Sequence, residues 1–445
     1  MKRETDYSLA QWATNLPVEW SITRQGNIAD VIFSNVDKHT YDEEINVLLC
    51  NYTDVYYNNR ITSKIEFMEA SAEEREINKF QLKKGDVLAT KDSESPDDIA
   101  ISALVAEELP GVLCGYHLAL VRPFPHKISG RYLAWLHSSK TFRAQYEARA
   151  VGVTRFGLAQ HIFKEIIVPL PSLLEQERIA TYLDKSCADI DAAVQAKRSQ
   201  IEILETTKES LIESTVTKGL QPNKNLQRID IDWMSEIPAH WKACRIKRIA
   251  LRVDYGISEK TEEEGRFPVL KMGHIQNGEI VFTNLDYVDE VSDDLILEQG
   301  DVLYNRTNSW DKVGKAAVFR GEKKDQVTFA SYLVRVRVNH KANPYFLNYV
   351  VNNAGFLGYA RKLAIPSVQQ SNLNSTRYCS LFIPLPPIAE QEAIVEFLDS
   401  KLANIKEVIA IINQQIKTLI EYRKSLIHEC VTGKRRVTEA DLEQV

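Results

Sequence analysis

Apolar residues recur at alternating spacings of three and four along two long segments of the chain. In the first segment these positions are Ala180, Leu183, Cys187, Ile190, Val194, Lys197, Ile201, Leu204, Lys208, Leu211 and Thr215, and eight of the eleven are apolar. In the second they are Val395, Leu398, Leu402, Ile405, Ile409, Ile412, Ile416, Leu419, Arg423, Leu426 and Cys430, and ten of the eleven are apolar. Such a pattern predicts a coiled-coil seam on a helix. At 1.5 Å per residue, each helix of ~45 residues would be roughly 65–70 Å long.

The simplest pairing joins the two helices to each other, because both belong to one chain. A seam with a partner protein, or with a second copy of the chain, is the alternative. At the start of the first helix, Ser172 and Glu175 have the spacing of a capping box, in which each side chain satisfies a free backbone amide.

The segment before each helix contains short runs rich in β-branched and aromatic residues, such as VIFSNV, VLLCNYTDVYY and YLVRVRV, separated by polar turns. Helical stretches are expected at residues 131–147 and 344–360, the second with Asn343 as cap and Pro344 at its first position. We therefore predict a mixed α/β globule, dominated by strands, before each helix.

Five separated motifs occur twice, so the chain is an internal duplication. Trp12-x-x-x-Leu16-Pro17-x-x-Trp20 returns as Trp233-x-x-x-Ile237-Pro238-x-x-Trp241. Gly85-Asp86-Val87-Leu88 returns as Gly300-Asp301-Val302-Leu303. The difference in residue number between Gly85 and Gly300 defines the repeat offset. At the repeat offset, Val168-Pro169-Leu170-Pro171 and Glu175-Gln176-Glu177 return as Ile383-Pro384-Leu385-Pro386 and Glu390-Gln391-Glu392, and Ser210-Leu211-Ile212 returns as Ser425-Leu426-Ile427. The domain boundaries follow from these repeats. They are an N-terminal segment with the first globule (1–168), a first long helix (169–219), a linker (220–236), a second globule (237–383), a second long helix (384–432) and a tail (433–445).

Composition narrows the class of protein. At 445 residues the chain is long enough for two or three domains. No apolar run approaches the ~20 residues of a membrane span and the start lacks a signal-peptide core, so a cytoplasmic protein without a membrane partner is expected. The six cysteines lie far apart without a C-x-x-C pair, which argues against a zinc site or a disulfide framework.

The net charge of −6 counts against nucleic acid at first, but the charges are patterned. Residues 41–110 hold 16 acidic and 7 basic residues, and residues 122–164 hold 8 basic residues and one acidic residue. Residues 253–301 then hold 13 acidic and 3 basic residues, and residues 306–378 hold 12 basic and 3 acidic ones. One such run usually marks a solvated face, but the repeated order suggests a basic surface in each globule. The acidic halves would face away from DNA or dock a partner.

Catalytic motifs are missing from the sequence. It has no G-x-x-x-x-G-K-[ST] loop for a nucleotide and no [NDS]-P-P-[YF] loop of amino-methylating enzymes. Glu322-Lys323-Lys324 has the spacing of a nuclease E-x-K without a suitable upstream acidic residue, and the nine histidines form no H-x-x-x-H. We therefore expect a non-catalytic protein without a metal site.

Together these features resemble the DNA specificity subunits of type I restriction-modification systems. The resemblance rests on I-P-x-x-W before each globule, with Leu16 in place of isoleucine in the first copy, and on [VI]-P-L-P-x-x-x-E-Q-E opening each helix. It rests also on the run from Gly300 to Ser309, GDVLYNRTNS, followed by Val313-Gly314-Lys315, which is similar to G-D-[IV]-L-x-N-R-T-N-S…V-G-K of that family. In the first globule Ala89-Thr90-Lys91-Asp92-Ser93 departs from this run, so the two globules should read different half-sites.

The resemblance implies an α+β protein in which two target-recognition globules are separated by two long antiparallel helices that form an intramolecular coiled coil. It implies that each globule reads one half of an asymmetric bipartite site in double-stranded DNA. The implied partners are two adenine-N6 methyltransferase subunits and, optionally, two translocase–nuclease subunits. S-adenosylmethionine, ATP and Mg²⁺ would then belong to these partners, and this chain would hold no cofactor.

Arg or Lys suits guanine, Asn or Gln suits adenine, and small polar or basic donors suit phosphate. In the first globule, the loop residues that meet this need are Lys91, Ser93, Arg149, Thr154, Arg155 and Gln160. In the second they are Tyr255, Asn305, Arg306, Asn308, Ser309, Lys312, Lys315, Gln369, Gln370, Asn372 and Asn374. Early loops add Asn35, Lys38 and His39. For each residue alone, capping a turn or solubilising a loop is an equally good interpretation.

Two other functions remain open at the level of sequence. One is the specificity subunit of a related multi-subunit methylation or defence system that lacks a type I nuclease, which neighbouring genes would distinguish. The other, from a different class, is a coiled-coil scaffold that carries two protein-binding globules. The salt dependence of DNA binding separates the scaffold from the DNA readers, because phosphate-driven binding weakens steeply with salt.

Overall fold

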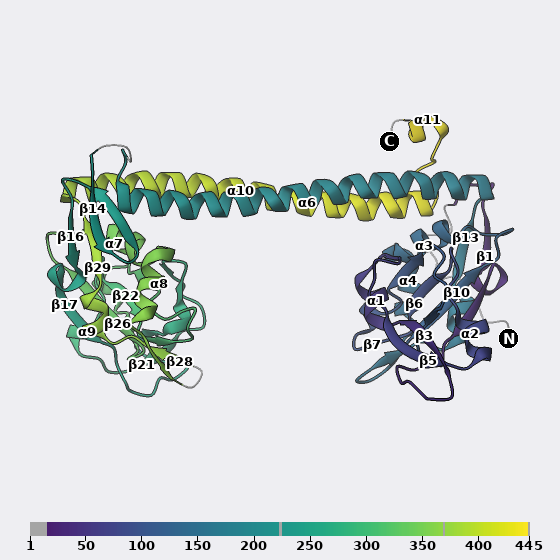
Figure 1. Ribbon diagram of the computed structural model, residues 1–445, viewed down its shortest axis with the longest axis horizontal. Coiled ribbons are helices and arrows are strands. Elements are labelled where there is room, and N and C mark those ends of the chain that lie inside the picture. Colours follow the sequence, from purple (N-terminus) through teal and green to yellow (C-terminus); the bar gives the residue numbers. More distant parts are fainter. Residues whose placement is uncertain (1–15, 222–224, 368–369, 444–445) are drawn as a thin grey trace. The chain divides into compact units, whose positions relative to one another are not determined.

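The structure of the chain is a computed structural model that describes residues 16–221, 225–367 and 370–443. The chain divides into two compact units, Met1–Lys197 with Asn413–Val445 and Arg198–Ile412. Each unit therefore combines one globule with about half of each of two long helices, α6 (Leu173–Lys218) and α10 (Ile388–Val431) (Figure 1).

The two helices run antiparallel within each unit. In the first unit, Lys197 Nζ donates to Gln415 Oε1 at 2.7 Å, and Arg423 Nε lies 3.0 Å from Asp191 Oδ1. In the second unit, Val216 near the end of α6 shares a core cluster with residues near the start of α10. The seam therefore joins helices of one chain, as the simplest interpretation predicted.

The seam follows the predicted register. All eleven predicted positions on each helix are buried or half-buried, including Lys197, Lys208 and Arg423. The exposed apolar residues of the helices, such as Ile203 and Ile411, lie outside the seam. The alternation of three and four identified the seam correctly because it depends only on helical geometry.

The start of each long helix is joined to its globule by a buried glutamine. Gln176 Nε2 donates to Pro171 O at 2.9 Å and to Lys127 O at 3.2 Å, and its Oε1 accepts from Ser129 N at 2.8 Å. Gln391, its counterpart at the repeat offset, makes the corresponding bonds to the backbone of Pro386, Lys341 and Asn343. The glutamine of the repeated E-Q-E motif is therefore structural.

The capping box expected at the start of α6 forms only in part. Ser172 Oγ accepts from Glu175 N at 3.3 Å. The carboxylate of Glu175 does not return this bond, because it accepts from Trp20 Nε1 at 3.1 Å and pairs with Arg436 Nη2 at 3.1 Å. The tertiary partners take precedence over the local cap.

Each long helix ends at a glycine with a left-handed backbone, which suits glycine because it has no Cβ. Gly219 has φ +75° and a Cβ there would lie 3.1 Å from Trp241 Cζ2. Gly433 has φ +70° and a Cβ there would meet Pro17 and lie 3.4 Å from the Trp20 ring. The end of each helix thus packs against the tryptophan motif that precedes the globule of the same unit.

The first globule is built on a five-stranded sheet flanked by smaller sheets (Figure 1). The order in the main sheet is β2 (Ala29–Phe33), β10 (Leu118–Pro123), β6 (Val87–Thr90), β8 (Ser102–Val105), β4 (Arg60–Ile61). The smaller sheets are β5 (Met68–Ala72), β3 (Ile45–Cys50), β9 (Val112–Cys114); β11 (Val151–Gly152), β12 (Phe156–Gly157), β7 (Asp92–Ser93); and β1 (Ser21–Arg24), β13 (Ile167–Leu170). The helices are α1 (Tyr52–Tyr57), α2 (Glu74–Phe80), α3 (Gly130–Ser138), α4 (Lys140–Glu147) and α5 (Gln160–Glu165), and α11 (Glu439–Glu443) follows α10.

The second globule repeats this plan on a four-stranded sheet. The order in that sheet is β17 (Ala250–Tyr255), β26 (Leu333–Val338), β22 (Val302–Asn305), β24 (Ala316–Val318). Beside it are β21 (Asp286–Val288), β18 (Phe267–Leu270), β25 (Thr328–Phe329); β23 (Thr307–Asn308), β28 (Gln370–Asn372), β27 (Ile365–Ser367); β16 (Lys242–Arg245), β29 (Phe382–Leu385); and β19 (Ile275–Gln276), β20 (Glu279–Ile280). The helices are α7 (Pro344–Val351), α8 (Ala354–Lys362) and α9 (Ser375–Ser380).

Each helical stretch predicted inside a globule is two shorter helices. The first is interrupted at Ser139, between α3 and α4. The second is interrupted because Asn353 Oδ1 accepts from Gly355 N at 2.8 Å and starts α8 as its cap. Asn343 caps α7 as predicted, accepting from Tyr345 N at 2.9 Å.

The segment expected as a linker, residues 220–236, largely forms a β-hairpin. Its strands are β14 (Leu226–Ile231) and β15 (Met234–Pro238), and Met234 is buried in the core of the second globule. Trp233 Nε1 donates to Phe382 O at 3.0 Å. The hairpin is therefore part of the second unit, and the other domain boundaries stay predictions.

A buried aspartate–arginine pair supports the main sheet of each globule. Arg122 donates to both carboxylate oxygens of Asp86, from Nε at 2.9 Å and from Nη2 at 2.8 Å. Arg337 binds Asp301 in the same way, at 2.7 and 2.8 Å, and both residues are the counterparts of the first pair at the repeat offset. These aspartates belong to the repeated Gly-Asp-Val-Leu motif, which therefore fixes the turn into β6 and β22.

Candidate nucleic-acid interface

A small three-stranded sheet in each globule brings together loops that are distant in sequence. In the first globule β12 pairs with β7, so that Gly157 lies opposite Asp92. In the second globule β28 pairs with β23, so that Asn372 lies opposite Thr307. Each of these positions is separated from its counterpart by the repeat offset, so the two sheets are equivalent. The loops expected to contact DNA after the Gly-Asp-Val-Leu strand and near the end of the globule do meet here.

A cation lies over an aromatic ring beside each of these sheets. Lys91 Nζ is 5.0 Å from the centre of the Phe33 ring and 4.6 Å from that of Tyr116, and burial lowers its pKa. Arg306, the equivalent residue, has its guanidinium carbon 4.9 Å from the centre of the Tyr255 ring. Stacking on a ring holds a cationic side chain in one direction while leaving its charge available.

The aromatic residues of these two pairs are equivalent as well. Phe33 lies opposite Ala119 in the pairing of β10 with β2, and Tyr255 lies opposite Val334 in the pairing of β17 with β26. Ala119 and Val334 are related by the repeat offset, so the strand register identifies the match. The Tyr255 hydroxyl is also 2.8 Å from Ser375 Oγ, which fixes the ring.

The other predicted residues of the first globule differ in their exposure and in whether their side chains bond to the protein. Thr154 and Arg155 are exposed in the turn between β11 and β12. Ser93 is buried, with 6% of its surface exposed. Gln160 Nε2 donates to Val31 O at 2.7 Å, and Arg149 Nη1 donates to Gln145 O at 3.0 Å, so both side chains support local structure.

In the second globule, Asn308 ends β23, and the loop after this strand holds Ser309, Lys312 and Lys315. Asn308 is half-buried, and its Oδ1 accepts from Ser309 N at 2.8 Å. Ser309 Oγ donates to Asp311 Oδ1 at 2.6 Å. Lys312 is exposed and Lys315 is half-buried. Gln370 is exposed on β28, and Gln369 lies outside the described residues.

Three predicted contacts of the second globule are buried or hydrogen-bonded within the protein. Asn305 is 1% exposed, so its assignment as a DNA contact is wrong for this fold: the side chain points into the interior at the end of β22. Asn374 caps α9 by accepting from Arg377 N at 2.9 Å. Asn372 Nδ2 donates to Thr307 Oγ1 at 2.9 Å across the small sheet.

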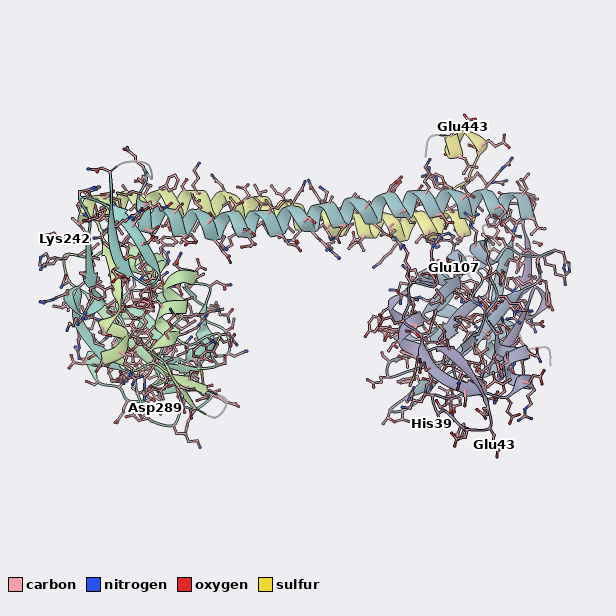
Figure 2. The ribbon with its side chains drawn as sticks, in the orientation of Figure 1. His39, Glu43, Glu107, Lys242, Asp289 and Glu443 are labelled. Carbon is pink, nitrogen blue, oxygen red and sulfur yellow. The ribbon has the colours of Figure 1, made fainter. Side chains whose placement is uncertain are left out.

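The acidic and basic runs of the sequence do not stay apart in space. Arg122 and Arg337, counted among the basic runs, bind the acidic-run residues Asp86 and Asp301. Arg335 is fully buried and binds Asp254. The repeated charge order therefore reflects internal ion pairs at least in these residues, and the basic surface of each globule stays a prediction. His39 and Glu43 lie at the end of the first globule opposite α6, and Asp289 lies at the end of the second opposite α10 (Figure 2).

Apart from Tyr255, the aromatic residues around these sheets were not predicted as site residues from the sequence. A cavity of about 310 Å³ beside Arg155 is lined by Tyr52, Tyr56, Asp92 and Asp98, among others. Tyr56 Oη donates to Asp98 Oδ2 at 2.7 Å, and burial raises the pKa of Tyr52. In the second globule Trp310 is 55% exposed in the loop after β23. A run of tyrosines after a predicted strand, and a tryptophan among polar loop residues, were the available signals.

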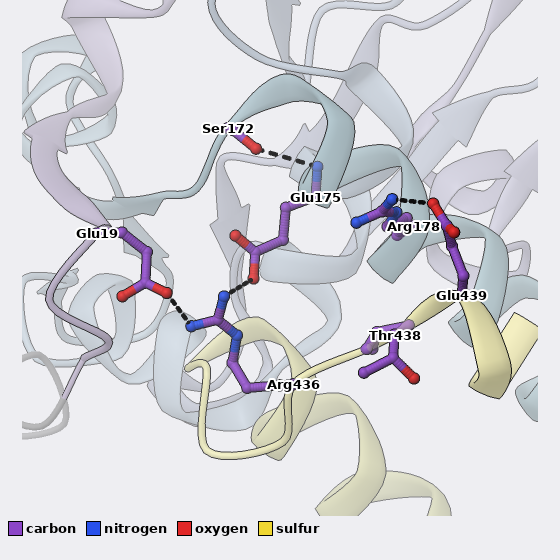
Figure 3. Close-up of a pocket in the computed structure, with 8 residues that line it drawn as sticks. Glu19, Ser172, Glu175, Arg178, Arg436, Thr438 and Glu439 are labelled. Atoms are coloured by element: carbon purple, nitrogen blue, oxygen red, sulfur yellow. Dashed lines mark hydrogen bonds and ion pairs between the residues drawn. The ribbon is translucent and has the colours of Figure 1, made fainter.

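A cavity of about 570 Å³ lies at the start of α6 and is lined by ion pairs (Figure 3). Arg436 pairs with Glu19 and with Glu175, and Arg178 pairs with Glu439. These pairs bind the segment after α10 to the first unit. Its charged groups already have partners, so the cavity is a structural junction.

In residues 16–221, 225–367 and 370–443, the side chains offer no metal site and the helices offer no membrane span. No group of three or more His, Cys, Asp or Glu side chains among them is arranged to hold a metal ion. No helix in this part of the chain is both long enough and apolar enough to cross a membrane.

Comparison with known proteins gives a consistent family. The model for the type I restriction modification DNA specificity domain matches residues 17–202 and 240–421. The putative type I restriction enzyme MjaX specificity subunit of Methanocaldococcus jannaschii is 25% identical over 440 residues, which cover 95% of each chain. The type I restriction enzyme EcoKI specificity subunit of Escherichia coli is 22% identical over 332 residues, which cover 73% of this chain and 68% of that one.

Two solved structures share the fold. One, described as the structural basis of complex assembly and conformational transition of the type I R-M system, has a TM-score of 0.73 at 16% identity, covering 94% of this chain and 99% of that one. The other, the HsdS subunit from Thermoanaerobacter tengcongensis, has a TM-score of 0.58 at 17% identity, covering 94% and 98%. Because the matched domain occurs twice and spans most of the sequence, the chain belongs to the family of type I restriction-modification DNA specificity proteins.

Proposed function

We propose that this chain selects the DNA sequence for a type I restriction-modification complex and that each globule reads one half of an asymmetric bipartite site. The observation that carries this proposal is the pair of equivalent small sheets with different side chains. Asp92, Ser93 and Gly157 of the first sheet correspond to Thr307, Asn308 and Asn372 of the second. Equal scaffolds with unequal polar side chains are what two different half-sites require.

Affinity and sequence reading would come from different residues of the same surface. Lys91 and Arg306, each held over a ring, would contact phosphate or guanine. Thr154, in the turn between β11 and β12 of the first globule, suits the DNA backbone. Lys312 and Lys315, in the loop after β23 of the second globule, suit it as well. Asn305 is excluded from this set because its side chain is buried, and Asn374 is excluded because its side chain caps α9.

The chain acts, in this proposal, without a catalytic residue, cofactor or metal of its own. Two adenine-N6 methyltransferase subunits would supply S-adenosylmethionine chemistry, and in a complete restriction complex two translocase–nuclease subunits would use ATP and Mg²⁺. The family assignment supports methyltransferase and restriction partners in general terms, and the stoichiometry is our extension. The complex would act on DNA in the cytoplasm.

Methylome sequencing tests the proposal directly. A host that expresses this chain with its methyltransferase subunits should acquire methyladenine on both strands of one bipartite motif. The purified chain alone should transfer no methyl group, and transfer by a rigorously pure chain would overturn the non-catalytic role. Joint replacement Arg306→Ala and Asn308→Ala should relax one half of the motif only, at about 1–3 kcal/mol for each lost base contact.

The remaining alternatives predict different outcomes. If a nuclease partner is absent, methylation persists while the host gains no restriction of unmodified DNA. If the chain is a protein scaffold, random duplex binds weakly at low salt and no motif is methylated. A steep fall of duplex binding with salt favours the DNA readers.

A further inference from the structure

We propose that Arg155 reads a guanine in the half-site of the first globule and that Asp92 and His117 are positioning residues for it. The proposal deepens the proposed function and rests on it, because it names one base pair that the first globule selects. It also assigns different chemistry to the equivalent place in the second globule.

The three side chains form one connected group at the edge of the small sheet. Arg155 donates to Asp92 Oδ1 from Nε at 3.2 Å and also from Nη2. His117 Nδ1 donates to the other oxygen, Asp92 Oδ2, at 2.8 Å. The side chain of Arg155 is 57% exposed, whereas that of Asp92 is 17% exposed. Asp92 therefore lies beneath an exposed guanidinium and holds it from one side.

The donors of Arg155 divide between the protein and the solvent. A guanidinium has five N–H donors in one plane. The edge formed by Nε and Nη2 faces Asp92, which leaves Nη1 and the outer hydrogen of Nη2 directed away from the carboxylate. Two parallel donors of this kind match guanine O6 and N7 in the major groove. Because Asp92 fixes the plane, less conformational freedom is lost when the base is bound.

The surroundings favour a base edge over a phosphate as the partner of Arg155. Asp92 forms an ion pair with Arg155, and Glu94 and Asp98 line the same cavity. A phosphate would meet repulsion from these carboxylates, whereas the neutral edge of a guanine meets only the directed donors. The ring of Tyr52, stacked on Tyr56 at 5.6 Å between centres, adds an apolar wall to the cavity that Arg155 lines.

The duplication provides an internal comparison. The counterparts of Arg155, Asp92 and His117 at the repeat offset are Gln370, Thr307 and Tyr332. The charged pair of Arg155 with Asp92 is thus replaced by uncharged side chains, while the supporting pairs Asp86–Arg122 and Asp301–Arg337 keep the same chemistry. Gln370 is exposed, and an amide suits adenine. The equivalent base pair of the second half-site is therefore expected to be A·T.

The test is affinity selection from a random duplex library by the full chain in complex with its methyltransferase subunits. The wild-type complex should enrich a bipartite motif with an invariant G·C pair in one half. Absence of any bipartite motif would contradict the proposed function itself. A bipartite motif in which replacement of Arg155 changes the preference at no G·C pair would overturn only the present inference.

Three variants of Arg155 and Asp92 separate the possible roles. Arg155→Lys keeps the charge but loses the planar fork, so preference at one G·C pair should fall by roughly 5- to 150-fold while the other half is unchanged. Arg155→Gln should shift that pair toward A·T. Asp92→Asn should relax the same pair, because the positioning carboxylate is lost. Uniform weakening by Arg155→Lys with an unchanged motif would identify a phosphate contact and overturn the inference.

The Asp–Arg pair can also be introduced into the second globule, with an arginine outside both three-stranded sheets as the control. Thr307→Asp combined with Gln370→Arg should move the corresponding pair of the second half toward G·C. Arg228→Lys alters an arginine whose side chain is 93% exposed and lies outside the small sheets, so its motif should match the wild type. Thermal unfolding of each variant checks that the fold is retained. If the Arg155 variants unfold, Arg155 is structural, and the inference is overturned.

Discussion

Trp241 donates its indole N–H to Glu390 Oε2 at 3.0 Å, across 149 residues of sequence. The same relationship recurs between Trp20 and Glu175 at 3.1 Å. In each case the tryptophan precedes a globule and the glutamate lies in the first turn of the helix that follows it. The bond therefore joins the segment that enters each globule to the helix that leaves it.

Trp241→Phe should destabilise the second unit by about 1–3 kcal/mol, because a buried hydrogen bond is lost. Trp241 is 2% exposed, so water cannot easily replace the indole as a donor. Urea unfolding of the full chain, followed by circular dichroism, measures the change. Trp310→Phe is the control, since that ring is 55% exposed, and its effect should stay within about 0.5 kcal/mol. Equal effects of the two changes would contradict this role of Trp241.

Gly219→Ala should destabilise the junction of α6 with the second globule by about 1–2 kcal/mol, the cost of a left-handed backbone for a residue with Cβ. The contact with the Trp241 ring adds to this cost. Gly358→Ala is the matched change inside α8, where nothing lies within 4 Å of the added Cβ. That variant should be stabilised by about 0.4–1 kcal/mol. Urea midpoints compare the two, and a neutral Gly219→Ala would show that the junction adjusts.

Asp301→Ala should cost about 3–5 kcal/mol, since removing one partner leaves buried charge uncompensated. Arg337 loses its paired bonds, and Arg335, fully buried, loses a carboxylate 3.5 Å away. Asp294→Ala removes an exposed partner of Arg252 and should change stability much less, because solvent screens the pair. Differential scanning calorimetry distinguishes them. A small effect of Asp301→Ala would mean that water reaches the arginines.

Acid should destabilise the first unit through His137. Burial lowers the pKa of this histidine from 6.5 to about 3, and its ring lies against Phe142 and Tyr146. Between these values the unfolded chain binds a proton that the native state does not, so stability falls as pH falls, by about 1.4 kcal/mol per pH unit. His137→Gln should therefore lose about 2 kcal/mol less than the wild type between pH 7 and pH 5. Parallel pH profiles of the two proteins would show that His137 does not titrate in this way.

The features predicted best are those set by short-range geometry. The seam residues of α6 and of α10 obey helical periodicity. Asn343 caps α7 because the atoms that form this bond are only two residues apart. The linker was mispredicted because Ile229 and Ile231 alternate with polar residues in a short stretch, and only the core of the second unit makes that alternation a strand. Glu175 likewise exchanges its local cap for distant partners.

The candidate interface was predicted as loops but not as a set of contacts. Lys91 and Arg155 were identified from residue type, whereas Asp92 reaches Arg155 and His117 only through side-chain hydrogen bonds across 63 and 25 residues of sequence. Asn305 has the residue type of a base reader, but it ends a buried strand. Residue type limits what a side chain can bind, and burial decides whether it is available.

The division of each long helix between the two units has an evolutionary consequence. The first globule is completed by residues 413–445 of the second copy, and the second globule by residues 198–219 of the first. An ancestor with one copy would have needed a second molecule of itself to cover both helix ends. Gene fusion would have made that association permanent, and it would have released the two reading surfaces from the requirement to be identical.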